Sequence, residues 1–329
     1  MNTTQTPKQT TSKDSLRLQT IKGSVMDIAG LMKAGRPNLD FIFSGFLRGT
    51  VGILAATSGT GKSFWVLGLS IALCCRSLNK LGISYKSELE VVYFSLEEPA
   101  VVVWDRIYSM LENATQEEID IVSSRLKIVS FYGKGFDIEQ YKEAISEYLA
   151  ENLNVAFVVV DTFSRSHSKK ENDTDEMATL LKEAFEALAF KSNIGVLILH
   201  HLSKAGTQSG DKSISAMRGS TVLSSNTRWK ANMTLMSEAE AATFTDPDFP
   251  SATIASSPGL HKKFVMFSED CSYSASPPAV WLKRTSNGVL QLITLNSSNM
   301  PVASSAIKSF NTPVAEPYKN WMGGFKVNH

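Results

Sequence analysis

The stretch GTVGILAATSGTGKSFWVLGLSIALCC, from Gly49 to Cys75, decides the fold of this chain. Its first part, residues 50–56, is apolar throughout, as expected for a strand buried on both faces. Its last part is an apolar run that reads as a buried helix. Between them lies a short polar loop with two glycines and a lysine. Such a loop is either a simple turn or a cradle for phosphate.

The loop follows the phosphate-binding pattern G-x-x-x-x-G-K-[ST], with Ala56 in place of the first glycine. A helix N-terminus offers unpaired N–H groups, and glycine lets an anion approach the backbone. Lys62 adds a charge, and the hydroxyl of Ser63 can bind Mg²⁺. Because the first glycine serves the turn, its loss is a mild departure. The predicted nucleotide-binding residues of the loop are Ala56, Ser58, Gly59, Thr60, Gly61, Lys62, Ser63 and Phe64.

Apolar segments alternate with helical patterns along the first two thirds of the chain. The expected strands are residues 50–56, 89–96, 127–132, 155–161 and 195–201. The expected helices are residues 61–75, 99–113, 115–126, 137–152 and 173–192. Strands that are apolar on both faces and alternate with helices predict an α/β fold with a mostly parallel sheet. From about Thr227 the pattern changes to shorter strands, which we expect to be antiparallel and to extend the same sheet.

Composition sets further limits. Among 329 residues, 33 Lys and Arg balance 32 Asp and Glu, so any contact with nucleic acid needs a local patch or a ring of subunits. The three cysteines have no metal-binding spacing and favour a reducing, cytoplasmic setting. The longest apolar run is too short for a membrane span. We expect a disordered leader over residues 1–20, a single core over 21–295 and a loosely ordered tail over 296–329.

Other polar residues stand at the expected carboxyl ends of strands, where open α/β sheets bind ligands. Asp161 ends one strand and can hold Mg²⁺ beside the loop, or can cap the next segment. Glu97, with Glu98 as the alternative, can polarise an attacking water. His200 and His201 end a further strand. Adjacent residues of a strand point to opposite faces, so one of the two can face the phosphate.

These segments together resemble a known family. The set GTVGILAATSGTGKS, VVYFSLEEP, VVVDTFSR, VLILHHLSK and AMRGSTVLSSNTRW, in this order, is similar to the RepA-type hexameric replicative helicases of plasmids, which belong to the RecA/DnaB-like ATPases. The resemblance covers about residues 38–295. It implies a RecA-like P-loop NTPase core, a ring of six subunits, and ATP-driven movement along single-stranded DNA in plasmid or phage replication. A replication initiator or primase is an implied partner.

The resemblance also implies roles for single residues. Lys62 and Ser63 match the ligands of phosphate and Mg²⁺, Asp161 the acidic residue at the strand end, and Glu97 the catalytic carboxylate. His201 matches the sensor of the γ-phosphate, with His200 as the alternative. Further matches are Arg228 as an arginine finger that reaches a neighbouring subunit, Arg218 as a second basic candidate, and Arg106 and Tyr273 as planar partners of adenine. Arg106 also fits a solvated arginine on a helix face.

Two features bear on how far the resemblance extends. Asp270, in EDCSY, stands where related sequences have a lysine, which puts full ATPase activity in doubt. The segment 203–216 resembles a loop that lines the channel of RecA-like rings, and its Lys204 and Lys212 can bind DNA phosphates, or the segment is a surface linker. The alternative functions are a RecA-like ATP-binding regulator or recombination mediator without unwinding activity, and a DNA-binding partner that uses ATP only to assemble.

Overall fold

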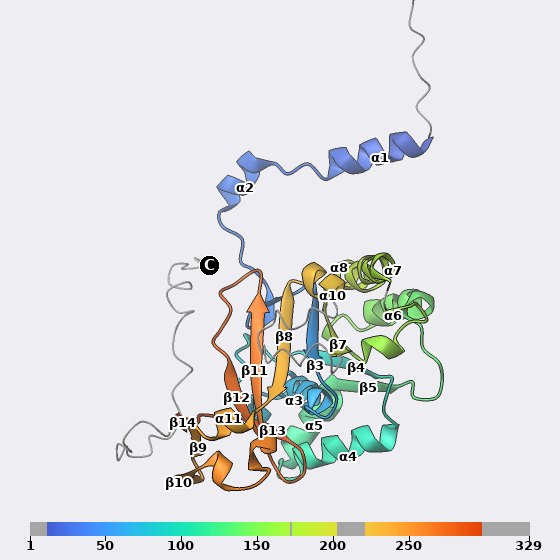
Figure 1. Ribbon diagram of the computed structural model, residues 1–329. Helices are drawn as coiled ribbons and strands as arrows, with labels where there is room; N and C mark the ends of the chain where they lie inside the picture. Colours follow the sequence, from blue (N-terminus) through green and yellow to red (C-terminus); the bar gives the residue numbers. More distant parts are fainter. Residues whose placement is uncertain (1–11, 172, 203–220, 298–329) are drawn as a thin grey trace, which may run out of the picture. The chain divides into compact units, whose positions relative to one another are not determined.

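The computed structural model describes residues 12–171, 173–202 and 221–297 (Figure 1). The chain divides into two units, Met1–Asp40 and Phe41–His329. The first unit contains helices α1 (Ser12–Gly23) and α2 (Ile28–Ala34). The expectation of a disordered leader is therefore wrong for residues 12–20, which form most of α1. The expectations for residues 1–11 and 298–329 lie outside the described residues.

The second unit is built on a sheet whose nine described strands follow the order β13–β12–β11–β8–β3–β7–β6–β4–β5 (Figure 1). Six neighbouring strands, from β8 to β5, are parallel. These strands are β3 (Val51–Ala56), β4 (Glu90–Ser95), β5 (Leu126–Ser130), β6 (Val155–Asp161), β7 (Gly195–His201) and β8 (Trp229–Leu235). The fold is the α/β arrangement predicted from the sequence.

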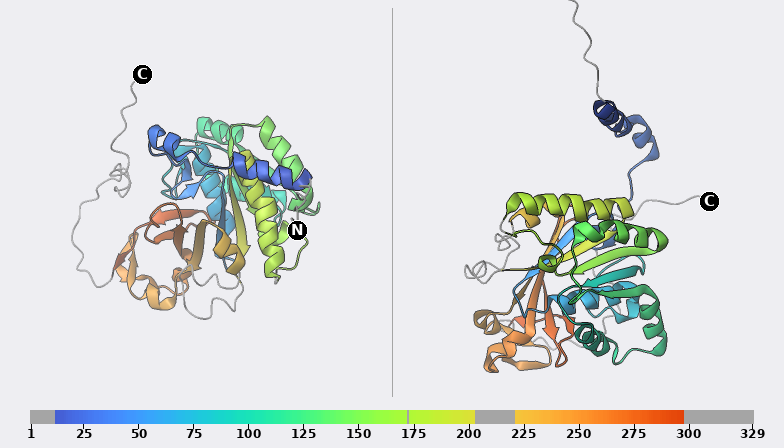
Figure 2. Two further views of the ribbon diagram at one scale, coloured as in Figure 1. Left: turned by 90° about the horizontal axis from the view of Figure 1, so that it is seen from above. Right: turned by 90° about the vertical axis from the view of Figure 1, so that its right-hand side faces the viewer.

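Helices cover both faces of this sheet (Figure 2). One face packs against α3 (Lys62–Cys74), α4 (Ala100–Leu111) and α5 (Gln116–Arg125). The other face packs against α6 (Ile138–Glu151), α7 (Thr174–Leu180), a π-helical turn (Leu181–Glu186), α8 (Ala187–Ser192) and α10 (Thr221–Asn226). Because both faces are covered, β3 and β6 are buried along their whole length, which explains their continuous apolar sequence.

Caps begin these helices where the sequence predicts. Thr115 and Glu118 form a capping box at the start of α5. The side chain of Asp137 accepts a hydrogen bond from the backbone N–H of Glu139 and begins α6. Asp173 accepts two backbone hydrogen bonds and begins α7. Each cap satisfies donors that the first turn of a helix leaves unpaired.

The antiparallel extension consists of β11 (Phe264–Cys271), β12 (Val280–Arg284) and β13 (Leu290–Ile293). The expectation that β8 is also antiparallel is wrong in part, because β8 pairs parallel to β3 and antiparallel only to β11. Smaller described elements are the hairpin β1 (Phe41–Phe43) and β2 (Phe46–Leu47), the sheet β10 (Phe249–Thr253), β9 (Phe244–Asp246) and β14 (Asn296–Ser297), helix α11 (Glu238–Ala241), and 3₁₀ turns at Arg76–Leu78, Phe163–Arg165, Ile254–Ser256 and Leu260–Lys263.

None of the described helices has the length and apolar character that a membrane crossing requires.

The register of the sheet determines which residues lie side by side at the carboxyl ends of the parallel strands. Ala56 at the end of β3 pairs with His201 of β7, and Ser95 at the end of β4 pairs with Asp161 of β6. The carboxyl ends of these four strands therefore lie along one edge, which we call the loop edge because the loop after β3 starts there.

Candidate active site

The loop between β3 and α3 turns at two glycines that have a left-handed backbone conformation. Gly59 and Gly61 both have positive φ, of 79° and 106°, which side chains other than glycine adopt only under strain. Thr60 is fully buried, and its hydroxyl donates to the carbonyl of Thr57 at 2.9 Å. Among the described residues, no side chain caps the N-terminus of α3. The first N–H groups of this helix are thus free of side-chain partners and suited to bind an anion.

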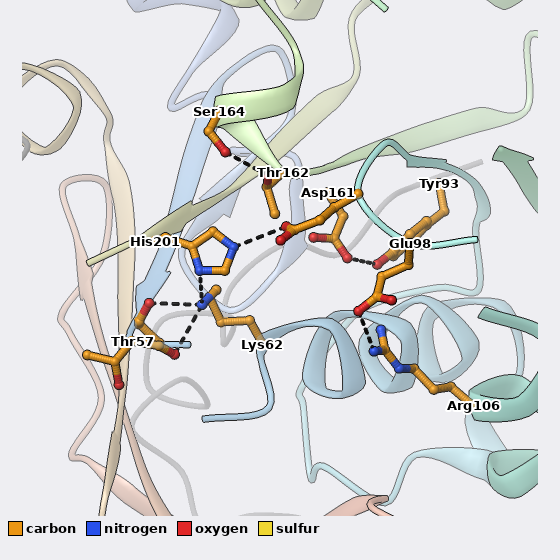
Figure 3. A network of polar contacts seen from close by, with 11 residues as sticks. Thr57, Lys62, Tyr93, Glu98, Arg106, Asp161, Thr162, Ser164 and His201 are labelled. Atoms are coloured by element: carbon orange, nitrogen blue, oxygen red, sulfur yellow. Dashed lines mark hydrogen bonds and ion pairs between the residues drawn. The ribbon is translucent and has the colours of Figure 1, made fainter. Parts of the chain in front are cut away.

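Lys62 is buried beside this loop, and its ammonium group has three hydrogen-bond partners within the chain (Figure 3). Its Nζ donates to the carbonyl oxygens of Ala56 at 2.8 Å and Thr57 at 3.2 Å. A third contact joins Nζ to Nδ1 of His201 at 3.1 Å. Burial lowers the pKa of Lys62 to about 8, against the opposing effect of the Asp161 and Glu97 carboxylates. Lys62 must give up at least one of these bonds to bind a phosphate.

His201 joins Lys62 to Glu97. The ammonium of Lys62 can only donate, so Nδ1 of His201 is the acceptor and Nε2 carries the proton. Nε2 in turn contacts the Glu97 carboxylate at 3.1 Å. Burial alone would raise the pKa of Glu97, but hydrogen bonds from His201 and Thr162 and the charge of Lys62 hold it below its usual value. Glu97 is therefore an ionised carboxylate that can accept a proton.

Asp161 lies beside the start of α3, at the end of β6. It is buried and accepts hydrogen bonds from the hydroxyl groups of Tyr93 and Ser63. Burial raises the pKa of Asp161, and these two hydrogen bonds oppose the rise. A carboxylate next to a serine hydroxyl is the oxygen donor set that Mg²⁺ takes in phosphate-binding sites. The two residues predicted to hold the metal ion are thus in hydrogen-bond contact.

The two glutamates after β4 point to different partners. Glu97 contacts His201, whereas Glu98 forms an ion pair with Arg106 at 2.7 Å. The side chain of Arg106 is 16% exposed, and its guanidinium lies 5.3 Å from the centre of the Phe64 ring. Arg106 is thus held beside the loop and is not a solvated arginine of the helix face. The pair of histidines also separates, because His200 is buried on the opposite face beside Phe163.

The edge of the sheet opposite the loop carries three residues that the sequence analysis singled out: Arg228, Tyr273 and Asp270. Arg228 directly precedes Trp229, which pairs with Gly52 at the beginning of β3, four residues and about 13 Å from the loop edge. Tyr273 follows the end of β11 at this same edge, because Cys271 pairs with Trp229. Tyr273 therefore lies away from the loop of its own chain, and its role as a planar partner of adenine stays a prediction.

Asp270 also lies at this far edge, where it pairs with Lys230 at 3.3 Å and accepts from Ser276 at 3.0 Å. Asp270 is thus separated from the loop of its own chain, and its effect on nucleotide binding or on a subunit interface stays a prediction. Arg228 is exposed, and its position cannot serve the loop of its own chain. Lys204, Lys212 and Arg218, predicted to bind DNA, lie outside the described residues.

Two residues near the loop escaped the sequence analysis. Arg284 of β12 donates to the carbonyl oxygens of Gly59 and Thr60. In the sequence, Arg284 is recognisable only as a basic residue directly before the turn TSNG, and this pattern does not predict a contact with the loop. Tyr93 binds Asp161 from the middle of β4, where its two neighbours in the strand are apolar. A buried tyrosine hydroxyl needs a partner, and that requirement was the available signal.

Comparison with known proteins agrees with this fold. A solved ATPase domain aligns with a TM-score of 0.52 at 14% identity, over 87% of this chain and all of that one. A DnaB-like replicative helicase, solved for its interactions with primase, aligns with a TM-score of 0.53 at 14% identity, over 85% of this chain and 71% of that one. The fold is that of RecA-like P-loop ATPase domains. The family profile described as "AAA domain" matches residues 13–207, more than half of the sequence, and the chain therefore belongs to the AAA domain family.

Proposed function

We propose that the protein hydrolyses ATP at the loop edge and couples this reaction to movement along single-stranded DNA, as a ring-shaped helicase of plasmid or phage replication. One observation carries the ATPase part of the proposal. Lys62, His201 and Glu97, from three different elements, form a continuous chain of contacts beside the N-terminus of α3. The cation that binds phosphate, Lys62, and the ionised carboxylate of Glu97 thereby lie in one site, as the transfer of a phosphoryl group to water requires.

The residues at the loop have distinct tasks in this reaction. The N–H groups at the start of α3 and the ammonium of Lys62 bind the phosphates of ATP. Glu97 orients the attacking water and accepts its proton. His201, which touches both Lys62 and Glu97, senses whether the terminal phosphate is present. Ser63 and Asp161 fit Mg²⁺, which supplies positive charge at the phosphates when it is bound.

The placement of Arg228 supports the ring of subunits in this proposal. An arginine at the far edge cannot reach the phosphate of its own subunit, but it can reach a site in a neighbour. In this proposal Arg228 is the arginine finger. The DnaB-like helicase of the comparison was solved for its interactions with primase, which favours a primase or a replication initiator as a partner of the assembled ring.

Contact with DNA is assigned to Lys204, Lys212 and Arg218. The chain is almost neutral, so affinity for DNA has to come from a few lysines and arginines repeated around a ring. The segment 203–216 has no aromatic residue, so binding by phosphate contacts without base stacking is expected. Replacing Lys204 and Lys212 together with alanine should weaken binding of a fluorescent oligonucleotide and flatten its dependence on salt. Equal salt slopes for both proteins would remove this segment from the DNA site.

The test of the helicase proposal has two measurements. The wild-type protein with ATP and Mg²⁺ should displace a strand from forked DNA, and single-stranded DNA should stimulate its ATP turnover. Turnover stimulated by DNA without displacement would instead support a RecA-like regulator or recombination mediator. Mixing Arg228→Ala subunits with Lys62→Ala subunits should restore part of the turnover that each lacks alone, because each supplies what its neighbour needs. Absence of any oligomer would contradict the ring.

A further inference from the structure

Arg284 reaches the phosphate loop from the antiparallel extension. It is the last residue of β12, and its Nη2 donates to the carbonyl oxygens of Gly59 at 3.1 Å and Thr60 at 2.6 Å. The loop and this arginine are more than two hundred residues apart in sequence. Hydrogen bonds from a guanidinium are stronger than those from neutral donors. One side chain thus binds two consecutive carbonyl groups of the loop, those of Gly59 and Thr60.

The hairpin that carries Arg284 packs tightly against the same region. A Cβ atom built on Gly61 would lie 3.0 Å from Nη2 of Arg284. A Cβ atom built on Gly288, in the turn between β12 and β13, would lie 2.6 Å from the ring of Phe64. Asn287 of this turn reaches the carbonyl of Ser109 in α4 at 3.4 Å. The hairpin therefore has little room to move relative to the loop.

The placement of Arg284 is costly in other respects. Its Nε is buried without a hydrogen-bond partner among the described residues. Within the same described part of the chain, no carboxylate forms an ion pair with it. A partly desolvated, unpaired guanidinium raises the free energy of the folded state. The two carbonyl groups of the loop are the contacts that offset this cost.

The loop itself needs such support. Gly59 and Gly61 lose more conformational freedom on ordering than other residues would. A loop that has to become ordered when the nucleotide arrives binds more weakly than one already in the bound conformation. We propose that Arg284 is a positioning residue that holds the phosphate loop in its binding conformation before ATP arrives. This inference rests on the proposed ATP site, but the order of the empty loop can be measured without ATP.

The experiment compares hydrogen exchange of backbone amides over residues 55–64 in nucleotide-free protein with the affinity for a fluorescent ATP analogue. Arg284→Ala should speed exchange in this segment and weaken ATP binding about tenfold, because part of the ordering of the loop would then have to occur on binding. Turnover at saturating ATP should stay near the wild-type rate because Lys62 and Glu97 are untouched. Arg284→Lys keeps the charge but lacks the guanidinium fork, so an intermediate effect is expected. Gln291→Ala, an exposed change on β13, is the control and should match wild type.

The outcomes separate the two proposals. If the wild-type protein binds no ATP, the proposed function fails, while faster exchange in Arg284→Ala would still support the positioning role. Unchanged exchange in both Arg284 variants would overturn that role whatever the nucleotide affinity. Lower turnover at saturating ATP with wild-type affinity and exchange would also overturn it, because Arg284 would then act on the reaction itself. If thermal melting shows that Arg284→Ala does not fold, Arg284→Lys decides by the same criteria.

Discussion

The parallel half of the central sheet and its antiparallel extension place side chains by different rules. In the parallel half every strand ends at the same edge, so Glu97, Asp161 and His201 meet beside the loop although about a hundred residues separate the first from the last. In the extension, neighbouring strands end at opposite edges. Arg284 at the end of β12 reaches the loop, whereas Tyr273 beyond the end of β11 lies at the far edge. Direction along the chain is thus sufficient to locate a strand end only in the parallel half.

The strongest test of the parallel half replaces the residues that meet there. Lys62→Ala should abolish ATP turnover, because the phosphates lose their buried cation. Glu97→Gln should lower turnover by about 10³-fold while ATP still binds, because an amide cannot accept the proton of the water. Glu98→Gln is the matched control, since Glu98 pairs with Arg106 and leaves His201 in place. Steady-state phosphate release measures all three. Normal turnover in Glu97→Gln with loss in Glu98→Gln would move the assignment by one residue.

A half-buried acid in the extension predicts how stability depends on pH. Burial raises the pKa of Glu269 on β11 to about 7, against the hydrogen bond that it accepts from the indole of Trp229. Between its unfolded pKa near 4.5 and this value the folded state binds more protons, so stability falls as pH rises. Glu269→Gln keeps an acceptor for Trp229 and should raise the free energy of unfolding at pH 8 by at most about 3 kcal/mol.

Urea unfolding at pH 5 and pH 8 measures this difference in stability. The variant should gain stability over the wild type at pH 8 and little at pH 5. The same loss of stability with pH in both proteins would show that Glu269 is not the titrating group. Because the Glu269 carboxylate bonds to Trp229, which lies at the far edge, ATP affinity should not change in this variant, and a change would contradict the separation of the two halves.

The pKa of Lys62 predicts that ATP binding depends on pH. Only the charged ammonium attracts phosphate, and burial lowers its pKa to about 8. Affinity should therefore be constant below pH 7 and should weaken by up to about tenfold between pH 8 and pH 9. Lys62→Arg, which stays charged, is the control and should remove this dependence even if it binds more weakly overall. An identical profile for both proteins would contradict the shifted pKa.

The smallest expected effect compares two planar side chains. Arg106→Ala should weaken ATP binding a few-fold, because Arg106 lies over Phe64 beside the loop. Tyr273→Ala should leave the affinity of the isolated subunit unchanged, because Tyr273 lies at the far edge. Titration at protein concentrations below assembly measures both. An effect of Tyr273→Ala that appears only on assembly would place this residue at a neighbour's site, whereas an effect in the isolated subunit would contradict the register of β11.

The sequence was sufficient for most of the parallel half, because largely apolar runs mark β3, β4, β6 and β7 and caps mark α5, α6 and α7. The predicted strand of residues 155–161 matches β6 residue for residue, and the Thr115 capping box forms as expected. The contacts among Glu97, His201 and Lys62 follow from strand ends that share one edge. The tautomer of His201 and the different partners of Glu97 and Glu98 required coordinates.

The extension was less predictable because the pattern of apolar residues does not indicate the direction of its strands. Short alternating segments indicate strands but not which neighbour each one pairs with, so the parallel pairing of β8 with β3 was missed. The same uncertainty hid the contact between Arg284 and the loop. Helix α1 was missed because its residues are mostly polar, and the structure shows residues 15–23 of it exposed.

Binding of ATP at the loop edge is the central claim, and calorimetric titration with a non-hydrolysable ATP analogue and Mg²⁺ tests it most directly. We expect one site per chain in the wild type, no detectable binding in Lys62→Ala, and wild-type binding in Gln291→Ala. Binding by Lys62→Ala that is as tight as that of the wild type would show that the nucleotide site is elsewhere, and would contradict the claim.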